Sequence, residues 1–521
     1  MESIWFIIII TLSFCATLKA LFNLIQKSKR LPPGPVSIPI LTSFQLLRKS
    51  TADLEPTLRN LKNKYGPIIT LSIGHRKSIF ITNSSLAHEA LIQNGAIFAD
   101  RPPATATFKV VSSNQHYING ASYGPLWRLL RRNLSLQILH PSKIKSFSPA
   151  RKWVMSIIKE SINKESKSGQ HPVLVVHHFQ FGMFCLLVFM CFGEKLDEKK
   201  VREIESVQRG LLLGFSRFQI LDFFPELSKI VLKKKWEDFY KLRSDQENVL
   251  IPLIRTRQEQ MKKKTSQDHE KSLGLCYVDS LLNLELPDAE GGRRKLTENE
   301  IVSLCSEFLN AGTDTTSAAL QWIMANLVKY QEIQSKLFDE IRIHLEKSGS
   351  HSDDDEIKEE DLKKLPYLKA VILEGLRRHP PAHFVLPHAV TQDVELDGYV
   401  VPKEATLNFM VAEIGWDPKV WEEPMVFKPE RFLNEENGFL NEELADVTGS
   451  KEVKMIPFGA GRRMCPAFGL AMLHLEYFVA NFIREFKWTA KAEDDIDLSE
   501  KQQFTIVMKN PLWAHVSARE N

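Results

Sequence analysis

Residues 457–469, PFGAGRRMCPAFG, form a glycine-rich stretch with one cysteine, and an apolar stretch at 470–486 follows directly. Gly459 and Gly461 permit backbone angles that other residues avoid, so this segment can bend tightly and bring its amides close to a flat ligand. Pro466 favours the first turn of a following helix. A helix N-terminus and nearby arginines lower the pKa of a thiol. We therefore expect Cys465 to be a thiolate and a metal ligand.

The spacing of Phe458, Gly461, Arg463 and Cys465 resembles the haem-binding loop of the cytochrome P-450 superfamily, and Ala467 stands where many members have Gly. In that family the cysteine thiolate is the proximal ligand of the haem iron. The resemblance implies haem b as the cofactor, Cys465 as its metal ligand, and Phe458, Gly461 and Arg463 as cofactor-binding residues. The alternative is a buried, unreactive cysteine in a glycine-rich turn.

The composition suits one large enzyme domain. The chain has 521 residues, 43% of them hydrophobic and 25% charged, so it can bury a sizeable core. A net charge of +4 is too close to balance to indicate a nucleic-acid-binding protein. The six cysteines show neither pairing nor CxxC spacing, which argues against a disulfide framework and a zinc site.

The N-terminus predicts a membrane anchor. Residues 4–25 are almost uninterruptedly apolar and long enough to span a bilayer as a helix. Lys27, Lys29 and Arg30 follow them, so the positive-inside rule leaves the rest of the chain in the cytosol. A cleaved signal peptide is the alternative, but it would have basic residues before the apolar run and small residues at a cleavage site.

A stiff spacer separates this anchor from the body, because residues 32–35 read PPGP and cannot continue a helix. We therefore divide the chain into an anchor (1–26), a basic, proline-rich hinge (27–40) and a haem-thiolate monooxygenase domain (41–521). Alternating residues from 65 to 81 predict a hairpin around Gly74.

Thr297 and Glu300 form a capping box that begins a helix extending to about Lys329. Residues 311–316, AGTDTT, are poor helix formers, and their hydroxyls can compete for backbone carbonyls and open the helix locally. This run resembles the oxygen-activation segment of the same superfamily. The resemblance implies that Ala311 and Gly312 leave space above the iron, and that Thr315 and Asp314 are catalytic residues that deliver protons.

Trp127 and Arg131 lie four residues apart, on one helix face, where they could bind a carboxylate together. A solvated basic face is the alternative. The resemblance implies that Trp127, Arg131, Arg101, His388 and Arg463 bind the haem propionates.

Glu374 and Arg377 are three residues apart in an apolar helix that should end at Pro380, and Arg431 follows in a Pro-x-Arg-Phe motif. An exposed ion pair of this kind contributes little to the stability of the fold. The resemblance instead implies a buried Glu374–Arg377–Arg431 network that fixes the cysteine loop. Trp416 departs from the family pattern, since plant members usually have Arg there, and the sequence offers no physical reason for it.

Three other regions are candidates for contacts. An aromatic cluster at 214–232 predicts either a part of the hydrophobic core or a surface that inserts into the membrane interface. A basic docking face for an electron donor could comprise Arg131, Arg132, Lys454 and Arg462. The apolar segments that would select a substrate lie at 103–122, 211–225, near Phe308, at 383–387 and at 504–507.

Together these features predict a mainly α fold with a small β region, the cytochrome P-450 fold, and a single N-terminal transmembrane helix. The implied reaction is insertion of one oxygen atom from O₂ into an apolar small molecule, which we expect to be a plant secondary metabolite. The chain lacks a GxGxxG strand–turn–helix unit, so electrons should come from NADPH through a separate NADPH–cytochrome P-450 reductase.

The expected location is the endoplasmic reticulum membrane, with lipid contacts through residues 4–25 and no nucleic-acid partner. The alternatives are a haem-thiolate isomerase or dehydratase and a non-catalytic haem-binding protein. Thr315 and Asp314 disfavour both.

Overall fold

The computed structural model describes residues 11, 14, 15, 17, 31–35, 51–73, 76–263, 276–287, 292–347, 356–403, 405–490 and 496–519. The expected anchor at 4–25 therefore lies almost entirely outside the described residues, and the hinge is described only at 31–35. Both remain predictions.

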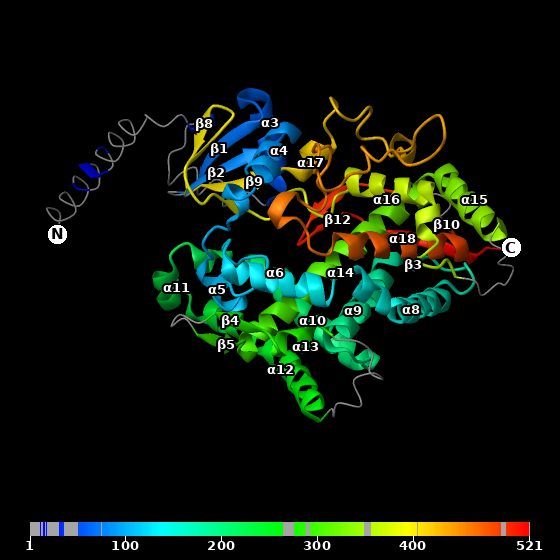
Figure 1. The fold of residues 1–521 in the computed structure, drawn as a ribbon, viewed down its shortest axis with the longest axis horizontal. Helices are drawn as coiled ribbons and strands as arrows, with labels where there is room; N and C mark the ends of the chain where they lie inside the picture. The colour runs from blue at the N-terminus through cyan, green and yellow to red at the C-terminus, as the bar shows by residue number, and fades with distance from the viewer. Residues whose placement is uncertain are drawn as a thin grey trace.

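The described chain is mainly helical, as the sequence predicts, and a smaller sheet region lies to one side of the helical body (Figure 1). The helices are α3 (Thr51–Tyr65), α4 (Ser84–His88), α5 (Ala106–Val111), α6 (Pro125–Gln137), α7 (Pro141–Ser146), α8 (Ser148–Ser166), α9 (Val175–Phe192), α10 (Glu198–Gly214), α11 (Pro225–Val231), α12 (Lys233–Lys263), α13 (Tyr277–Leu282), α14 (Glu298–Lys329), α15 (Gln331–Lys347), α16 (Pro366–Arg378), α17 (Val411–Gly415) and α18 (Phe468–Glu485). Short 3-10 or π turns occur at η1 (Glu89–Gln93), η2 (Ile97–Ala99), η3 (Phe215–Asp222), η4 (Leu362–Lys364), η5 (Pro429–Phe432) and η6 (Gly461–Arg463).

The largest sheet is built on the predicted hairpin. Strands β1 (Ile68–Ile73) and β2 (Arg76–Ile81) pair antiparallel, β9 (Thr406–Phe409) runs parallel to β2, and β6 (His388–Ala389) pairs antiparallel with β9. The turn between β1 and β2 lies outside the described residues. Figure 1 shows α3 and α4 beside this sheet.

The other sheets are small. One has the order β10–β13–β3, and three hairpins pair β4 with β5, β7 with β8, and β11 with β12. Their bounds are β3 (Val173–Leu174), β4 (Glu285–Pro287), β5 (Arg293–Lys295), β7 (Val394–Leu396), β8 (Tyr399–Val401), β10 (Phe486–Thr489), β11 (Glu500–Gln502), β12 (Ile506–Met508) and β13 (Trp513–Ala518).

Helix α14 is the central element of the core. It has 32 residues and begins with the predicted capping box, in which the Thr297 hydroxyl and the Glu300 carboxylate each accept a backbone N–H. It packs against α9, α12, α16 and α18. The helix is continuous through residues 311–316, so the expected local opening is wrong. Thr313 and Thr315 donate to the carbonyls of Leu309 and Ala311 without displacing the helical backbone.

Within the described residues, α9 alone is long and apolar enough to cross a membrane, and 78% of that segment is buried inside the protein. It packs against α8 and α14 in the largest hydrophobic cluster. A mostly apolar helix that packs against other helices is a core helix.

Candidate active site

The Cys465 loop bends where its glycines permit. Gly459 and Gly461 have φ angles of 69° and 67°, in the left-handed region that favours glycine. The Cys465 amide donates to the Phe458 carbonyl at 2.9 Å and closes the loop. A Cβ atom built at Gly461 would collide with the Leu91 carbonyl oxygen, so this glycine is also required by close packing.

The surroundings of Cys465 differ from the expectation in two ways. Helix α18 begins at Phe468 with Ala467 as its N-cap, so Pro466 precedes the helix instead of occupying its first turn. Burial raises the pKa of the Cys465 thiol, although the Ala467 amide and the positive charge of Arg131 both favour the thiolate. Burial outweighs these two effects, so the expected downward direction of the pKa shift is wrong. A bound cation would supply the missing stabilisation of the thiolate.

Three arginines converge on backbone carbonyls near this loop. Arg463 donates to Ala99 at 2.7 Å and to Ala121 at 2.6 Å. Arg101 donates to Asn119 at 2.7 Å, and Arg131 donates to the Met464 carbonyl at 2.6 Å. In the part of the chain that the structure describes, no carboxylate lies within 4.0 Å of these guanidinium groups.

None of these three arginines forms an ion pair within the described residues, although Asp100 and Glu307 lie near enough to favour the charged form of Arg101. Burial lowers the pKa of Arg463 to about 9, and repulsion from Arg101 and Arg131 acts in the same direction. Burial lowers the pKa of Arg101 to about 10. Buried cations that lack an ion-paired anion are costly. The two propionates of haem b would provide such anions.

Trp127 places a further hydrogen-bond donor beside these arginines. Its side chain is buried, and its indole Nε1–H has no hydrogen-bond partner among the described residues. The Arg463 guanidinium lies 4.5 Å from the centre of the indole ring. A buried N–H without an acceptor is unfavourable, and a propionate oxygen would satisfy it. Trp127, Arg131 and Arg463 thus fit a haem.

His388 fits less well. It is buried, and its Nδ1 lies 2.6 Å from the Phe98 carbonyl, which can only accept, so Nδ1 carries the proton. Burial and the nearby Arg101 and Arg463 lower the pKa of His388 to about 3. A neutral imidazole has no second N–H for a propionate, so His388 would contribute only if a bound anion raised that pKa.

Glu307 of α14 is a site residue that the sequence motifs missed. Its carboxylate accepts the amides of Ile118 and Asn119 at 2.9 and 2.6 Å. The carbonyls of these two residues accept from Arg463 and Arg101, respectively. Burial raises the pKa of Glu307 to about 7. The only sequence signal is its position one helical turn before Ala311, on the same helix face.

The side chains of the predicted oxygen-activation segment of α14 lie in two different surroundings. Ala311 is exposed and Thr315 is partly exposed, in the middle of a helix that is otherwise mostly buried. Asp314 instead points toward α10, where it forms an ion pair with Arg209. A Cβ built at Gly312 would lie 2.7 Å from Leu187 of α9, so a glycine here lets α14 and α9 pack closely. Ala311 is the residue on the exposed side of α14.

The Glu374–Arg377–Arg431 network has the predicted geometry. Glu374 and Arg377 are buried, and Arg377 donates to both carboxylate oxygens at 2.7 and 2.8 Å. Arg431 Nε lies 3.2 Å from Glu374 Oε1, and the Lys428 amide donates to the same oxygen at 2.8 Å. Glu374 therefore connects α16 to η5, which carries Arg431.

Comparison with known proteins agrees with this geometry. Residues 32–515 match the family model for cytochrome P450. The chain is 48% identical to cytochrome P450 89A9 of Arabidopsis thaliana, over 99% of both chains. It is 30% identical to isoflavone 2'-hydroxylase of Medicago truncatula, over 95% of this chain and 93% of that protein.

The fold also matches a solved structure. A zebra fish cytochrome P450, solved with progesterone, superposes with a TM-score of 0.73 over 90% of this chain and 100% of that one, at 22% identity. The chain is a member of the cytochrome P450 family, and thus an oxidoreductase of the monooxygenase type with haem b as its cofactor.

Proposed function

We propose that this protein inserts one oxygen atom from O₂ into an apolar plant secondary metabolite, with electrons from NADPH delivered by a separate NADPH–cytochrome P-450 reductase. The observation that carries the proposal is the cluster of Arg101, Arg131 and Arg463, which form no ion pair among the described residues, beside the Trp127 indole and the Cys465 loop. The names of plant relatives support the substrate class, since they include an isoflavone hydroxylase and a costunolide synthase.

The residues near Cys465 would hold haem b. Cys465 would ligate the iron, and Trp127, Arg131, Arg101 and Arg463 would bind the propionates. Phe458 would pack beside the ring, since it is partly buried against the main core next to the cysteine loop. When bound, the haem supplies activation of O₂ at its iron.

The polar residues of α14 would handle protons. The Thr315 hydroxyl now donates to the Ala311 carbonyl at 2.6 Å, and it is partly exposed, so it could turn toward oxygen. Asp314 is the acid next to it in the sequence, although its carboxylate is paired with Arg209 of α10. Its part in proton delivery would require that carboxylate to turn from Arg209 toward Thr315, since an acid passes a proton to a hydroxyl only over a short distance. These residues favour monooxygenation over a haem-thiolate isomerase or dehydratase and over a non-catalytic haem-binding protein.

Electron delivery would use the exposed basic side chains near the cysteine loop. Arg462 donates to the Tyr123 hydroxyl at 2.7 Å, Arg128 stacks on the same ring, and Arg132 is exposed. Lys454 is paired with Glu443 and Arg131 is partly buried, so these two would contribute less. The charge reversals Arg132→Glu and Arg462→Glu should slow reduction by the reductase at low salt, while Lys200→Glu should not. Unchanged rates in both variants would contradict this docking face.

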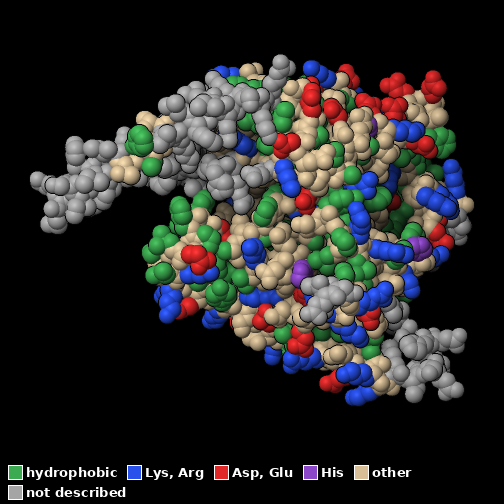
Figure 2. All heavy atoms as spheres, turned by 60° about the vertical axis from the view of Figure 1, so that its left-hand side comes forward, with side chains coloured by type: hydrophobic (Ala, Val, Ile, Leu, Met, Phe, Trp, Pro, Cys, Tyr) green, Lys and Arg blue, Asp and Glu red, His purple; other side chains and the backbone are tan. Residues whose placement is uncertain are grey.

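Membrane contact would involve the predicted anchor and the surface around α11. Phe224, Ile230 and Val231 are 72%, 79% and 67% exposed, and lysines follow them at the start of α12. Figure 2 shows hydrophobic side chains gathered on this part of the surface. An apolar surface rimmed by lysines suits a lipid interface. These features support a location at the endoplasmic reticulum membrane with the catalytic domain in the cytosol.

The test is spectroscopic and then chemical. The purified full-length protein, reduced and treated with carbon monoxide, should show the strongly red-shifted Soret band of a thiolate-ligated haem. Candidate metabolites are then screened for displacement of the iron-bound water. Those that bind should be oxidised, with NADPH consumption that depends on added reductase. A bound metabolite that is rearranged without NADPH would favour the isomerase, and no turnover of any binder would favour the non-catalytic protein.

A further inference from the structure

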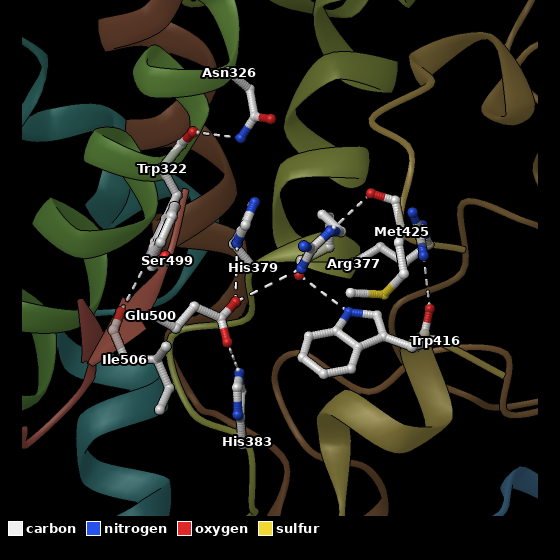
Figure 3. A network of polar contacts seen from close by, with 12 residues as sticks. Trp322, Asn326, Arg377, His379, His383, Trp416, Met425, Ser499, Glu500 and Ile506 are labelled. Atoms are coloured by element: carbon white, nitrogen blue, oxygen red, sulfur yellow. Dashed lines mark hydrogen bonds and ion pairs between the residues drawn. The ribbon is translucent and has the colours of Figure 1, made fainter. Parts of the chain in front are cut away.

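A second cluster of charged side chains surrounds Trp416, the residue that departs from the family pattern. Figure 3 shows the Glu500 carboxylate between His379 and His383, with the Trp416 indole nearby. His379 and His383 follow the end of α16, and Glu500 begins strand β11. The proposed function gives none of these residues a role.

Glu500 is the common partner of three groups in this cluster. His379 Nδ1 lies 3.0 Å from Glu500 Oε1, and His383 Nε2 lies 3.3 Å from Oε2. Arg378 Nη1 lies 3.7 Å from Oε1. Both histidines are buried, and Arg378 Nη1 and His383 Nε2 have no hydrogen bond of good geometry among the described residues. Glu500 is therefore the carboxylate that these three groups share.

Trp416 covers the cluster. Its Nε1–H donates to the Arg378 carbonyl at 3.0 Å, and its ring lies 5.4 Å from the Arg378 guanidinium and 5.1 Å from that of Arg59. The His383 ring meets it edge-on at 5.2 Å. His383 Nδ1 also lies 2.7 Å from Glu55 of α3. An indole in this place excludes water, which strengthens the interactions among the charges.

The same cluster attaches the β11–β12 hairpin to the segment after α16. The Ile506 amide donates to the Pro381 carbonyl at 2.8 Å. The Trp322 indole of α14 donates to the Ile506 carbonyl at 2.9 Å, and the His379 ring stacks on Trp322 at 4.1 Å. With Glu500, these contacts fix the hairpin turn at 503–505 relative to residues 379–383.

Residues 385–387, which follow the segment at 379–383, lie at the proposed active site. Val385 lies beside Gly459 of the cysteine loop, since a Cβ at Gly459 would contact it at 3.6 Å. The carbonyls of Leu386 and Pro387 accept from Arg101 at 2.9 and 2.8 Å. Residues 385–387 therefore lie between the cluster and the proposed haem-binding loop, held on the haem side by Arg101.

We propose that Glu500, covered by Trp416, is a positioning residue that sets the spacing between two segments of the substrate space, 383–387 and 504–507. Leu386 and Phe504 are 52% and 49% exposed, and we assign them as the side chains whose separation the cluster controls. This inference rests on the proposed function, because it deepens the account of the same site. Glu500 touches neither the haem-binding residues nor α14, so its loss should change the fit of a bulky ligand and leave the haem in place.

The test compares two azole probes on the full-length holoprotein: imidazole, which is small, and clotrimazole, which is bulky. Both bind haem iron and shift its absorption. Glu500→Gln keeps the shape of the side chain and removes its charge. It should retain wild-type haem content and imidazole affinity, and it should bind clotrimazole about fivefold more weakly, which corresponds to about 1 kcal/mol. Trp416→Leu should act in the same direction. Lys501→Gln, on the same strand with an exposed side chain, should match the wild type.

Equal loss of affinity for both azoles, loss of haem, or unchanged clotrimazole binding in Glu500→Gln would each overturn the positioning role. If Glu500→Gln does not fold, His383→Asn carries the same expectation and the same contrary outcomes. A wild-type protein that shows no azole shift would instead refute the proposed haem site, and this inference with it.

Discussion

Arg209 of α10 forms an ion pair with Asp314 of α14, and Gln180 of α9 lies 3.5 Å from the same carboxylate oxygen. Burial raises the pKa of Asp314, and the positive charge of Arg209 opposes that rise. The acid proposed to pass protons at the active site is thus paired with a cation on a neighbouring helix.

Replacing Arg209 by Gln should leave Asp314 buried without a counter-charge. Because the Arg209 side chain is itself 26% exposed, we expect a stability loss of about 1–3 kcal/mol, below that of a fully buried pair. The pKa of Asp314 should rise, so the acidic limb of the pH–rate profile should move to higher pH. Thermal unfolding and NADPH oxidation across pH measure both effects. Lys200→Gln, which removes an exposed pair on the same helix, is the control. Equal effects in the two variants would contradict the role of Arg209.

Replacing Glu374 by Ala should produce protein without haem. The change leaves the Arg377 guanidinium buried and unpaired and frees the Lys428 amide, at a cost of about 3–5 kcal/mol. Haem content per protein, from the reduced carbon monoxide spectrum, is the measurement. Glu346→Ala, which removes only the exposed pair with Arg342, should retain haem. Normal haem content in Glu374→Ala would refute the prediction.

Much of the fold was predictable because local rules govern it. Alternation predicted the β1–β2 hairpin, the capping box fixed the start of α14, and the diproline at 380–381 follows the end of α16 at Arg378. The Glu374–Arg377–Arg431 network was predicted from the family resemblance, because the spacing of Glu374 and Arg377 alone indicates only an ordinary exposed pair.

The remaining site residues depend on contacts that no local pattern encodes. Arg209 lies 105 positions from Asp314, and Glu307 lies 189 positions from Ile118. The pKa of Cys465 failed as a prediction for a related reason. The helix-terminus rule is local, whereas burial depends on how the whole chain packs around the thiol. The presence of Trp416 likewise has a physical explanation only in its contacts with Arg59, Arg378 and His383.

Adding a methyl group at Gly461 should destabilise the cysteine loop. The residue would have a φ of 67° and a Cβ in collision with the Leu91 carbonyl, so we expect a loss above the 1–3 kcal/mol that backbone strain alone costs. Gly469→Ala is the matched control, because it lies in α18 with nothing within 4 Å of its added Cβ. That change should stabilise the helix by roughly 0.5–1 kcal/mol. Thermal unfolding and haem content distinguish the two, and similar behaviour of both variants would contradict the strain argument.

Glu307 should make stability depend on pH near neutrality. Burial raises its pKa from 4.5 to about 7, although the amides of Ile118 and Asn119 oppose the rise. Between these values the native state holds a proton that the unfolded chain has released, so the free energy of unfolding falls as pH increases. The full effect would be on the order of 3 kcal/mol. Glu307→Gln cannot titrate, so the wild type should lose stability relative to this variant between pH 5 and pH 8. Unfolding temperatures of both proteins across that range test the idea, and a constant difference between them would show that Glu307 is ionised throughout.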